Sequence, residues 1–431
     1  MDAPESPQGT LQPAEAIAEA KINAPAGHVG AGRSGRSRSF PTFDDLTLIP
    51  CSLSRVPLEA FYEQCTTATT LGTRFAAQPL VLSTPVTIAG MGAKLLSPAV
   101  RAALASGSAR AGTLYTTGYG GMLAAEREHA TMLSYEVLPS RIDFDPRHML
   151  QSDVIELVSV RGLSPSIGMP SRNSREEAQL AGTLPETAYS RLSHAPTRHP
   201  DWVGSDDLPK KVEELREATD WRIPIIVKIS AAHVYDDVQL AAKAGADIIT
   251  VEGMEAGAST GPAILNQNTG VPGIAAVCQA RRALEELGLE DEVNLILCGG
   301  IRSGADVAKA LALGVNAVSI GTAALNSLEP WTQHVNAQGD GATDSAGLCA
   351  AGEDSGESGP TAIADLPGFT DAARRMANFI AALTQEIQLL ARACGKANVH
   401  DLEAEDLRAL SLEASLVTNV PLVGMDTVIG R

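Results

Sequence analysis

Two glycine turns in the C-terminal half of the sequence have the spacing of a phosphate-binding site. Gly299 and Gly300 end one apolar run and precede a helical pattern. Gly321, Thr322 and Ala323 end the next apolar run in the same way. Such turns direct several backbone N–H groups toward one point, as in the loops after strands 7 and 8 of (β/α)8 barrels. We therefore predict a cradle for the phosphate of flavin mononucleotide (FMN). The alternative is two helix-capping turns that bind no ligand.

Two cationic side chains accompany this pattern. Lys228 lies near the end of the apolar run at residues 223–230, where an inward side chain would stabilise negative charge at the N1–C2 carbonyl region of a flavin. The alternative is a lysine that extends outward from a strand end. The apolar flanks favour the inward position, because an unpaired charge among them would be costly. Arg302 follows the first turn and either adds positive charge to the cradle or faces solvent.

Other expected strand ends carry further candidates. Gly90 and Met91 follow residues 86–89, and backbone groups there could contact the edge of an isoalloxazine ring. Thr116 and Thr117 end another expected strand and precede a glycine-rich turn, which by itself is a weak signal. Glu252 ends a third strand and is a candidate acid–base group, although an exposed loop carboxylate is the commoner situation.

The order of the elements predicts a parallel sheet. From residue 85 to residue 328, about seven apolar strands alternate with helical patterns, one of them expected over residues 124–133. Alternation of this kind, at this length, predicts an α/β fold of the (β/α)8 TIM-barrel type with an N-terminal arm and a C-terminal helical extension. A polar stretch at residues 162–210 is too long for an ordinary loop and is a candidate active-site excursion or interface.

The pattern also divides the chain into segments. The expected segments are a flexible N-terminal arm (residues 1–41), a barrel-capping segment (42–84), an FMN-binding (β/α)8 synthase domain (85–328), an acidic Gly/Ser-rich loop (329–369) and a C-terminal helical extension (370–431).

Composition narrows the class of protein. The net charge of −18 argues against nucleic acid or an anionic membrane as a partner, and no apolar run reaches the length of a membrane span. The six cysteines are scattered without a CxxC motif, as expected for a reducing, cytoplasmic compartment and not for a metal site. No P-loop, Rossmann fingerprint or Ser-His-Asp pattern is visible.

Several segments together resemble the FMN-binding synthase domain of glutamate synthase, and especially the stand-alone "glutamate synthase domain 2" type, which includes the C subunit of N-methylglutamate synthase. The segments that carry the resemblance are FDDLTLIPCSLSRVPLE, CTTATTLGTRFA, PVTIAGM, TTGYGGM, EVLPSR, RHPDWVGSDDL, KAGADIITVEGM, GGIRSGADVAKALALGVNAVSIGTAAL and ARACGKANVHDLEAEDL. They extend from about residue 43 to about residue 410.

The resemblance implies a flavoprotein oxidoreductase of glutamate biosynthesis, acting on CH–NH2 or CH–NH groups. By this resemblance, it is expected to reduce an imine of 2-oxoglutarate to glutamate or an N-alkyl glutamate. Such a barrel works in an oligomeric complex with an amidotransferase-like subunit and a β-helix-like subunit. Lys228 and the residues of the two glycine turns fall on positions that the family uses around FMN.

The sequence departs from the family pattern at the substrate end. Lys94 and Leu95 replace small residues in the loop at 92–96, and the loop at 162–171 lacks the usual glycines and lysine. An iron–sulfur cluster is not expected, because only Cys349 stands near the family's three cluster cysteines. Two alternatives therefore stay open: a degenerate, non-catalytic scaffold subunit of such a complex, and a purine-nucleotide dehydrogenase or reductase on the same type of barrel.

Overall fold

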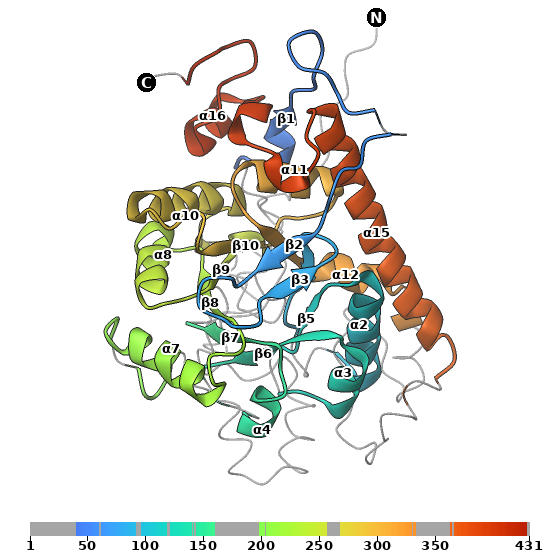
Figure 1. Cartoon of the computed structure of the whole chain (residues 1–431), viewed down its shortest axis with the longest axis vertical. Coiled ribbons are helices and arrows are strands. Elements are labelled where there is room, and N and C mark those ends of the chain that lie inside the picture. The colour runs from blue at the N-terminus through green and yellow to red at the C-terminus, as the bar shows by residue number, and fades with distance from the viewer. Residues whose placement is uncertain are drawn as a thin grey trace, which may run out of the picture.

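Eight parallel strands form a closed barrel in the computed structural model (Figure 1). The structure describes residues 40–59, 62–91, 96–118, 121–139, 141, 144–159, 198–202, 204–256, 268–329, 331–332, 363 and 366–428. In chain order the barrel strands are β4 (Val86–Ile88), β5 (Leu114–Thr116), β6 (Met132–Val137), β7 (Val154–Val158), β8 (Ile225–Ser230), β9 (Ile248–Glu252), β10 (Asn294–Cys298) and β11 (Ala317–Ile320). Pairing of β11 with β4 closes the ring, which confirms the predicted TIM barrel.

Strand β6 corrects the prediction of a helix over residues 124–133. The helix α3 ends at His129, and the strand begins at Met132. Ser134 and Glu136 interrupt the apolar residues of this segment, so it lacks the continuous apolar run of the other strands. In the barrel these two side chains alternate with Leu133 and others that belong to the outer apolar core. The count of about seven strands was therefore one short.

Helices cover the outside of the barrel. They are α2 (Pro98–Ala111), α3 (Ala124–His129), α4 (Pro146–Met149), α7 (Asp207–Ala218), α8 (Val234–Lys243), α10 (Gly273–Leu287), α11 (Gly304–Ala312), α12 (Thr322–Ser327) and α15 (Phe369–Ala393). The apolar side of α15 packs against α2 and α11, so this late helix lies between the seventh and first outer helices (Figure 1). The predicted C-terminal helical extension thus supplies the eighth helix of the ring.

Alternation along the strands separates two apolar cores. Side chains such as Leu133, Ile155 and Val227 point outward and pack with the helices in the large core. Side chains one position away, such as Val154 and Ile226, point inward and form a second, smaller core. This second core lies only at the end of the barrel where the strands begin.

A hairpin closes that end of the barrel. Strands β2 (Thr69–Leu71) and β3 (Leu80–Leu82) pair antiparallel, and Leu71, Leu80 and Leu82 join the inward residues of six barrel strands in the smaller core. Gly72 sits against the wall, because a Cβ there would lie 2.4 Å from Pro224 Cγ. Its N–H donates a hydrogen bond of 2.7 Å to Asn294 Oδ1. The part of the predicted capping segment that covers the floor is therefore this hairpin.

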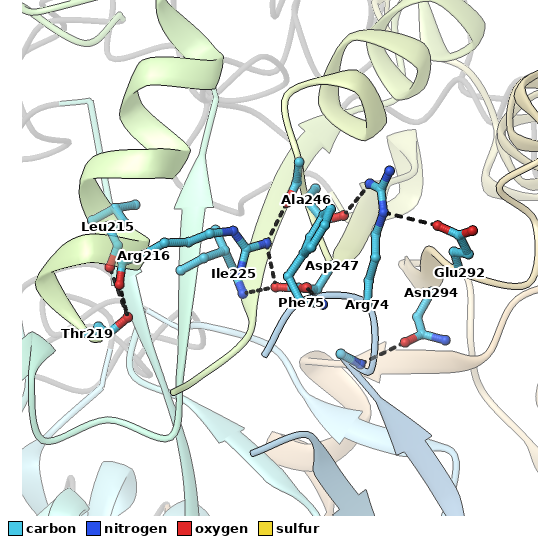
Figure 2. A network of polar contacts seen from close by, with 12 residues as sticks. Arg74, Phe75, Leu215, Arg216, Thr219, Ile225, Ala246, Asp247, Glu292 and Asn294 are labelled. Atoms are coloured by element: carbon cyan, nitrogen blue, oxygen red, sulfur yellow. Dashed lines mark hydrogen bonds and ion pairs between the residues drawn. The ribbon is translucent and has the colours of Figure 1, made fainter. Parts of the chain in front are cut away.

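A buried ion pair fixes the hairpin to the floor (Figure 2). Arg216 Nη2 lies 2.9 Å from Asp247 Oδ2, and the two side chains are 2% and 0% exposed. Asp247 also accepts hydrogen bonds from the backbone N–H groups of Ile225 and Phe75, at 2.7 and 2.9 Å. Arg74 donates to the carbonyl oxygen of Ala242 at 2.9 Å. The carboxylate of Asp247 thus joins a barrel strand, an outer helix and the hairpin.

The two ends of the described chain meet beside α11. Strand β1 (Leu46–Leu48) pairs antiparallel with β12 (Leu407–Ala409), and the 3-10 helix η1 (Phe43–Asp45) contacts α11. The short helix α16 (Leu412–Thr418) follows β12 at the same end of the molecule (Figure 1). Within the described ranges, every helix is too short or too polar to cross a lipid bilayer.

We expect Asp247→Ala to lower the free energy of unfolding by about 3–5 kcal/mol, because Arg216 would stay buried without its counter-charge. Urea unfolding followed by circular dichroism measures this. The matched control is Asp291→Ala, an exposed aspartate of the same end, which should change stability by less than about 0.5 kcal/mol. Equal stability of the two variants would show that the ion pair does not hold the floor together.

Candidate active site

Lys228 lies inside the barrel near its C-terminal end, as the inward prediction required. The side chain is 8% exposed, and its Nζ lies 3.1 Å from Glu156 Oε1 and 3.2 Å from Glu136 Oε1. Glu252 Oε1 is farther away, at 3.9 Å, and its side chain is 25% exposed. These four groups come from the consecutive strands β6, β7, β8 and β9. The interior of the barrel mouth is therefore charged, whereas its floor is apolar.

The register of the strands explains this cluster. Glu136 pairs directly with Glu156 on the neighbouring strand, and Lys228 pairs with Val158, two residues further along β7. Residues two apart on a strand face the same side, so all three charged side chains point into the barrel. Glu136 and Glu156 were not among the predicted site residues. The signal was the one that identified Lys228, a charged residue in an otherwise apolar strand.

Burial and mutual attraction set the protonation of these groups. Burial acts to lower the pKa of Lys228, but Glu156, Glu136 and Glu252 outweigh it, so the pKa lies well above its ordinary value and the amine stays charged. Burial raises the pKa of Glu156 to about 7, against the attraction of Lys228 and with a further contribution from Glu136. Burial also raises the pKa of Cys298 to about 12, so this neighbouring thiol is a neutral packing group.

The loops after β4 and β5 approach each other closely beside this cluster. A Cβ at Gly90 would lie 2.9 Å from Glu136 Oε1 and 2.9 Å from Gly118 Cα, so no larger residue fits. Thr116 and Thr117 are buried, and Thr117 Oγ1 accepts a hydrogen bond of 3.3 Å from the Glu136 N–H. The structure thus brings Thr117 and Gly90 to Glu136, whereas Thr116 pairs with Ser134 on the neighbouring strand.

A second buried ion pair fixes the loop after β5. Arg101 and Glu126 are 1% and 0% exposed, with 2.7 Å between Arg101 Nη2 and Glu126 Oε2. The same arginine donates a hydrogen bond of 2.6 Å to the carbonyl oxygen of Gly121, and the Tyr115 hydroxyl donates one of 2.6 Å to Glu126 Oε1. Helix α2, helix α3 and strand β5 together hold the end of the glycine-rich turn in place.

The first predicted glycine turn is built as close backbone contact. Gly299 and Gly300 have φ values of 108° and 75°, which favour glycine. A Cβ at Gly299 would lie 2.8 Å from the backbone nitrogen of Ala256, in the 3-10 helix η2 (Met254–Ala256). Glu255, in the same short helix, accepts hydrogen bonds of 3.0 and 3.1 Å from the Gly273 N–H at the start of α10. Glu255 is therefore a helix cap.

The second glycine turn borders a cavity of about 430 Å³. Three predicted residues line it, and the full lining is Ile301, Arg302, Thr322, Ala323, Asn326, Ser327 and Phe379. Phe379 comes from α15, so the late helix forms one wall. Gly321 connects this cavity to the barrel mouth, because a Cβ there would lie 3.7 Å from Met91 Sδ and 3.9 Å from Ala89 Cβ, both in ordinary van der Waals range.

Arg302 carries a charge that its neighbours already balance. Its Nη2 lies 2.7 Å from Asp44 Oδ1, and its Nε lies 3.2 Å from Asp306 Oδ2. Hydrogen bonds from Arg302 hold the pKa of the Asp44 carboxyl below its ordinary value. The side chain is 58% exposed. Arg302 lines the cavity, but its more definite role is to tie the N-terminal segment to the start of α11.

Residues 198–202 dock on the carboxyl end of β7. His199 Nε2 lies 2.7 Å from the carbonyl oxygen of Val158, and the ring stacks on Trp202 with 5.0 Å between centroids. Burial lowers the pKa of His199, so the imidazole is neutral. Arg141 and Asp201 form an ion pair of 2.7 Å beside it. Lys94, Leu95, Cys349 and most of the 162–210 stretch lie outside the described residues.

These features fit an FMN molecule at the carboxyl ends of the strands. At two glycine positions without room for a Cβ, 90 and 299, the loops at the strand ends pack closely on neighbouring backbone, which fixes their position at the barrel mouth. The cavity beside the second turn would take a phosphate, and Lys228 marks the end where the ring would lie. Within the described ranges, no group of three histidine, cysteine or carboxylate side chains has an arrangement that could hold a metal ion.

Two kinds of sequence comparison relate the chain to known proteins. The family model of a conserved region in glutamate synthase matches residues 50–397. A glutamate synthase large subunit-like protein of Rhizobium meliloti (strain 1021) is 42% identical over 426 residues, which cover 96% of this chain and 95% of that protein. An archaeal glutamate synthase (NADPH) of Methanocaldococcus jannaschii is 33% identical over 341 residues, which cover 78% of this chain and 64% of that protein.

Solved structures share the fold at low sequence identity. A mandelate oxidase variant with a C4a-OH-FMN adduct has a TM-score of 0.51 and 18% identity, with 85% of this chain and 87% of that chain covered. A flavocytochrome b2 variant with pyruvate bound has a TM-score of 0.54 and 16% identity, with 89% and 80% covered. The likeness to these two is one of fold, whereas the sequence matches extend over most of the chain. The chain belongs to the glutamate synthase family.

Proposed function

We propose that the chain is an FMN-dependent synthase subunit of the glutamate synthase type, an oxidoreductase that reduces a 2-oxoglutarate-derived imine to glutamate or an N-alkyl glutamate. The observation that carries this proposal is Lys228, a charged lysine that is buried at the carboxyl ends of the barrel strands. The glycine turns of this chain follow strands at the same end of the barrel. The archaeal relative is named a glutamate synthase and the solved neighbours include FMN-containing proteins, which supports the proposal.

Different residues of this chain would contact the phosphate and the ring of the cofactor. Backbone groups of Gly299, Gly300, Gly321, Thr322 and Ala323 would hold the phosphate beside the 430 Å³ cavity. The loop of Gly90 and Met91 would contact the ring, and Lys228 would stabilise negative charge at its pyrimidine edge. When bound, FMN would supply the hydride that the imine carbon takes up, and the imine nitrogen takes one proton.

We also propose partner subunits and a reducing location. The Rhizobium relative is named a large subunit-like protein, which supports a complex. The partners that we propose are an amidotransferase-like and a β-helix-like subunit. The described cysteines Cys51, Cys65, Cys278, Cys298 and Cys394 are free thiols, as expected in the cytoplasm. The archaeal relative is named with NADPH, which supports a nicotinamide nucleotide as the electron donor to the flavin.

One observation favours the scaffold alternative. Lys228 is surrounded by carboxylates, and Arg302 is balanced by two aspartates. Within the described residues, these two predicted cations therefore offer no unpaired charge to a dianionic substrate. A scaffold subunit would need none. The loops at 92–96 and 162–171, where the sequence departs from the family pattern, lie outside or largely outside the described residues.

The test is a flavin spectrum and turnover of the purified chain, co-expressed with its neighbouring subunits. We expect bound FMN, and imine reduction with 2-oxoglutarate and an amine donor. Lys228→Met should lower kcat/KM by about 10²–10³, the usual effect of removing one charge-stabilising donor. Lys243→Met, at an exposed lysine of α8, is the matched control. A colourless protein that takes up no FMN would contradict the proposal, and FMN binding without turnover would favour the scaffold.

We expect Gly299→Ala to raise the dissociation constant of FMN about tenfold or more, equivalent to about 1.4 kcal/mol. The added methyl group would meet the Ala256 nitrogen and displace the loop. Fluorescence titration of FMN measures the constant. Gly288→Ala is the control for backbone strain, since Gly288 has a φ of 65° at the end of α10 and nothing within 4 Å of a Cβ. Equal affinity of both variants would place FMN away from this turn.

A further inference from the structure

The charges around Lys228 do not balance. Glu136, Glu156 and Lys228 are only 8%, 5% and 6% exposed, so all three are almost fully removed from water. With both carboxyls ionised, the three groups would carry a net charge of −1, two negative charges against one positive. Burying an uncompensated charge is costly, and a carboxyl group in this position takes up a proton instead. One proton on the pair makes the trio neutral.

Within the part of the chain that the structure describes, the neighbouring elements do not supply the missing positive charge. The groups that face the trio are Glu252 from β9, which is negative and partly exposed, and Cys298 from β10, whose thiol is neutral. Ser134 on β6 and Thr250 on β9 contribute buried hydroxyl groups without a hydrogen-bond partner. None of these groups brings positive charge, and the negative charge of Glu252 favours a protonated carboxyl.

The two carboxyls are placed to share the proton. Glu136 and Glu156 are direct partners in the β6–β7 register, and each points one oxygen at Lys228 Nζ. The second oxygen of Glu136, Oε2, is buried and has no hydrogen-bond partner. A proton on Glu156 would be donated to Glu136, and this hydrogen bond is one of the causes that raise the pKa of Glu156 to about 7.

We propose that Glu136 and Glu156 share one proton around Lys228, and that this proton sets the net charge of the barrel mouth. With the proton present, the trio is neutral and Lys228 can face a further negative group. Without it, the trio is an anion that repels such a group. The pair acts through Lys228, so these glutamates are positioning residues. If the chain binds FMN as proposed, the proton content of the pair tunes how strongly Lys228 stabilises negative charge on the ring.

Infrared difference spectroscopy of the flavin-free protein, labelled with carboxyl-¹³C glutamate, tests this directly. We expect a protonated-carboxyl band that disappears with a midpoint near pH 7 in the unmodified chain. Glu156→Gln should abolish the band, and Glu136→Gln should move its midpoint down by one pH unit or more. Glu213→Gln, on the exposed side of α7, should leave it unchanged. Ionisation of both carboxyls near their ordinary value of 4.5 would overturn the proposal.

Stability provides a second readout that needs no spectroscopic label. A pKa raised on folding favours the protonated folded form, so the contribution of this pair is greatest below about pH 4.5 and falls as the pH rises to about 7. Glutamine does not titrate, so the unfolding free energy of the unmodified chain should fall relative to that of Glu156→Gln as the pH rises over this window. A constant difference would contradict the proposal. Neither measurement needs FMN, so failure here is distinct from failure of the proposed function.

Discussion

A charged lysine inside a closed barrel must be compensated, and much of this structure follows from that requirement. Lys228 contacts Glu156 and Glu136 at 3.1 and 3.2 Å, so two neighbouring strands each give up an apolar interior position to a carboxylate. The room for these carboxylates limits the loop above them, because Gly90 has no space for a Cβ beside Glu136. The glycine turn and the charged strands are therefore parts of one arrangement, in which the mouth of the barrel is reserved for polar chemistry.

The floor, at the opposite end of the barrel, is apolar where the mouth is charged. The β2–β3 hairpin fills the interior with leucines, and the Arg216–Asp247 pair fixes it from outside (Figure 2). The side chains of this smaller core are apolar and pack closely, as in protein interiors generally. Helix α15 packs against α2 and α11 on the outside of the barrel. Its Phe379 also lines the cavity beside the second glycine turn.

The barrel could be predicted because parallel strands in a two-sided core are nearly all apolar and alternate with helices. Strand β6 escaped this rule, because Ser134 and Glu136 point inward to the polar mouth. The two glutamates could have been found by the argument that singled out Lys228. The ion pair between Arg302 and Asp44 could not have been predicted, because the two residues lie 258 positions apart in the sequence and no local pattern relates them. The place of α15 in the ring depends likewise on packing between distant segments, after a long acidic stretch.

A crystal structure of the chain with FMN tests the central claim most directly. The account predicts the phosphate against the backbone of residues 299–300 and 321–323, the ring beside Gly90 and Met91, and Lys228 Nζ within hydrogen-bonding distance of the pyrimidine edge. Glu136 and Glu156 should keep their contacts with the lysine. FMN bound elsewhere, or a ring whose pyrimidine edge faces away from Lys228, would contradict the account.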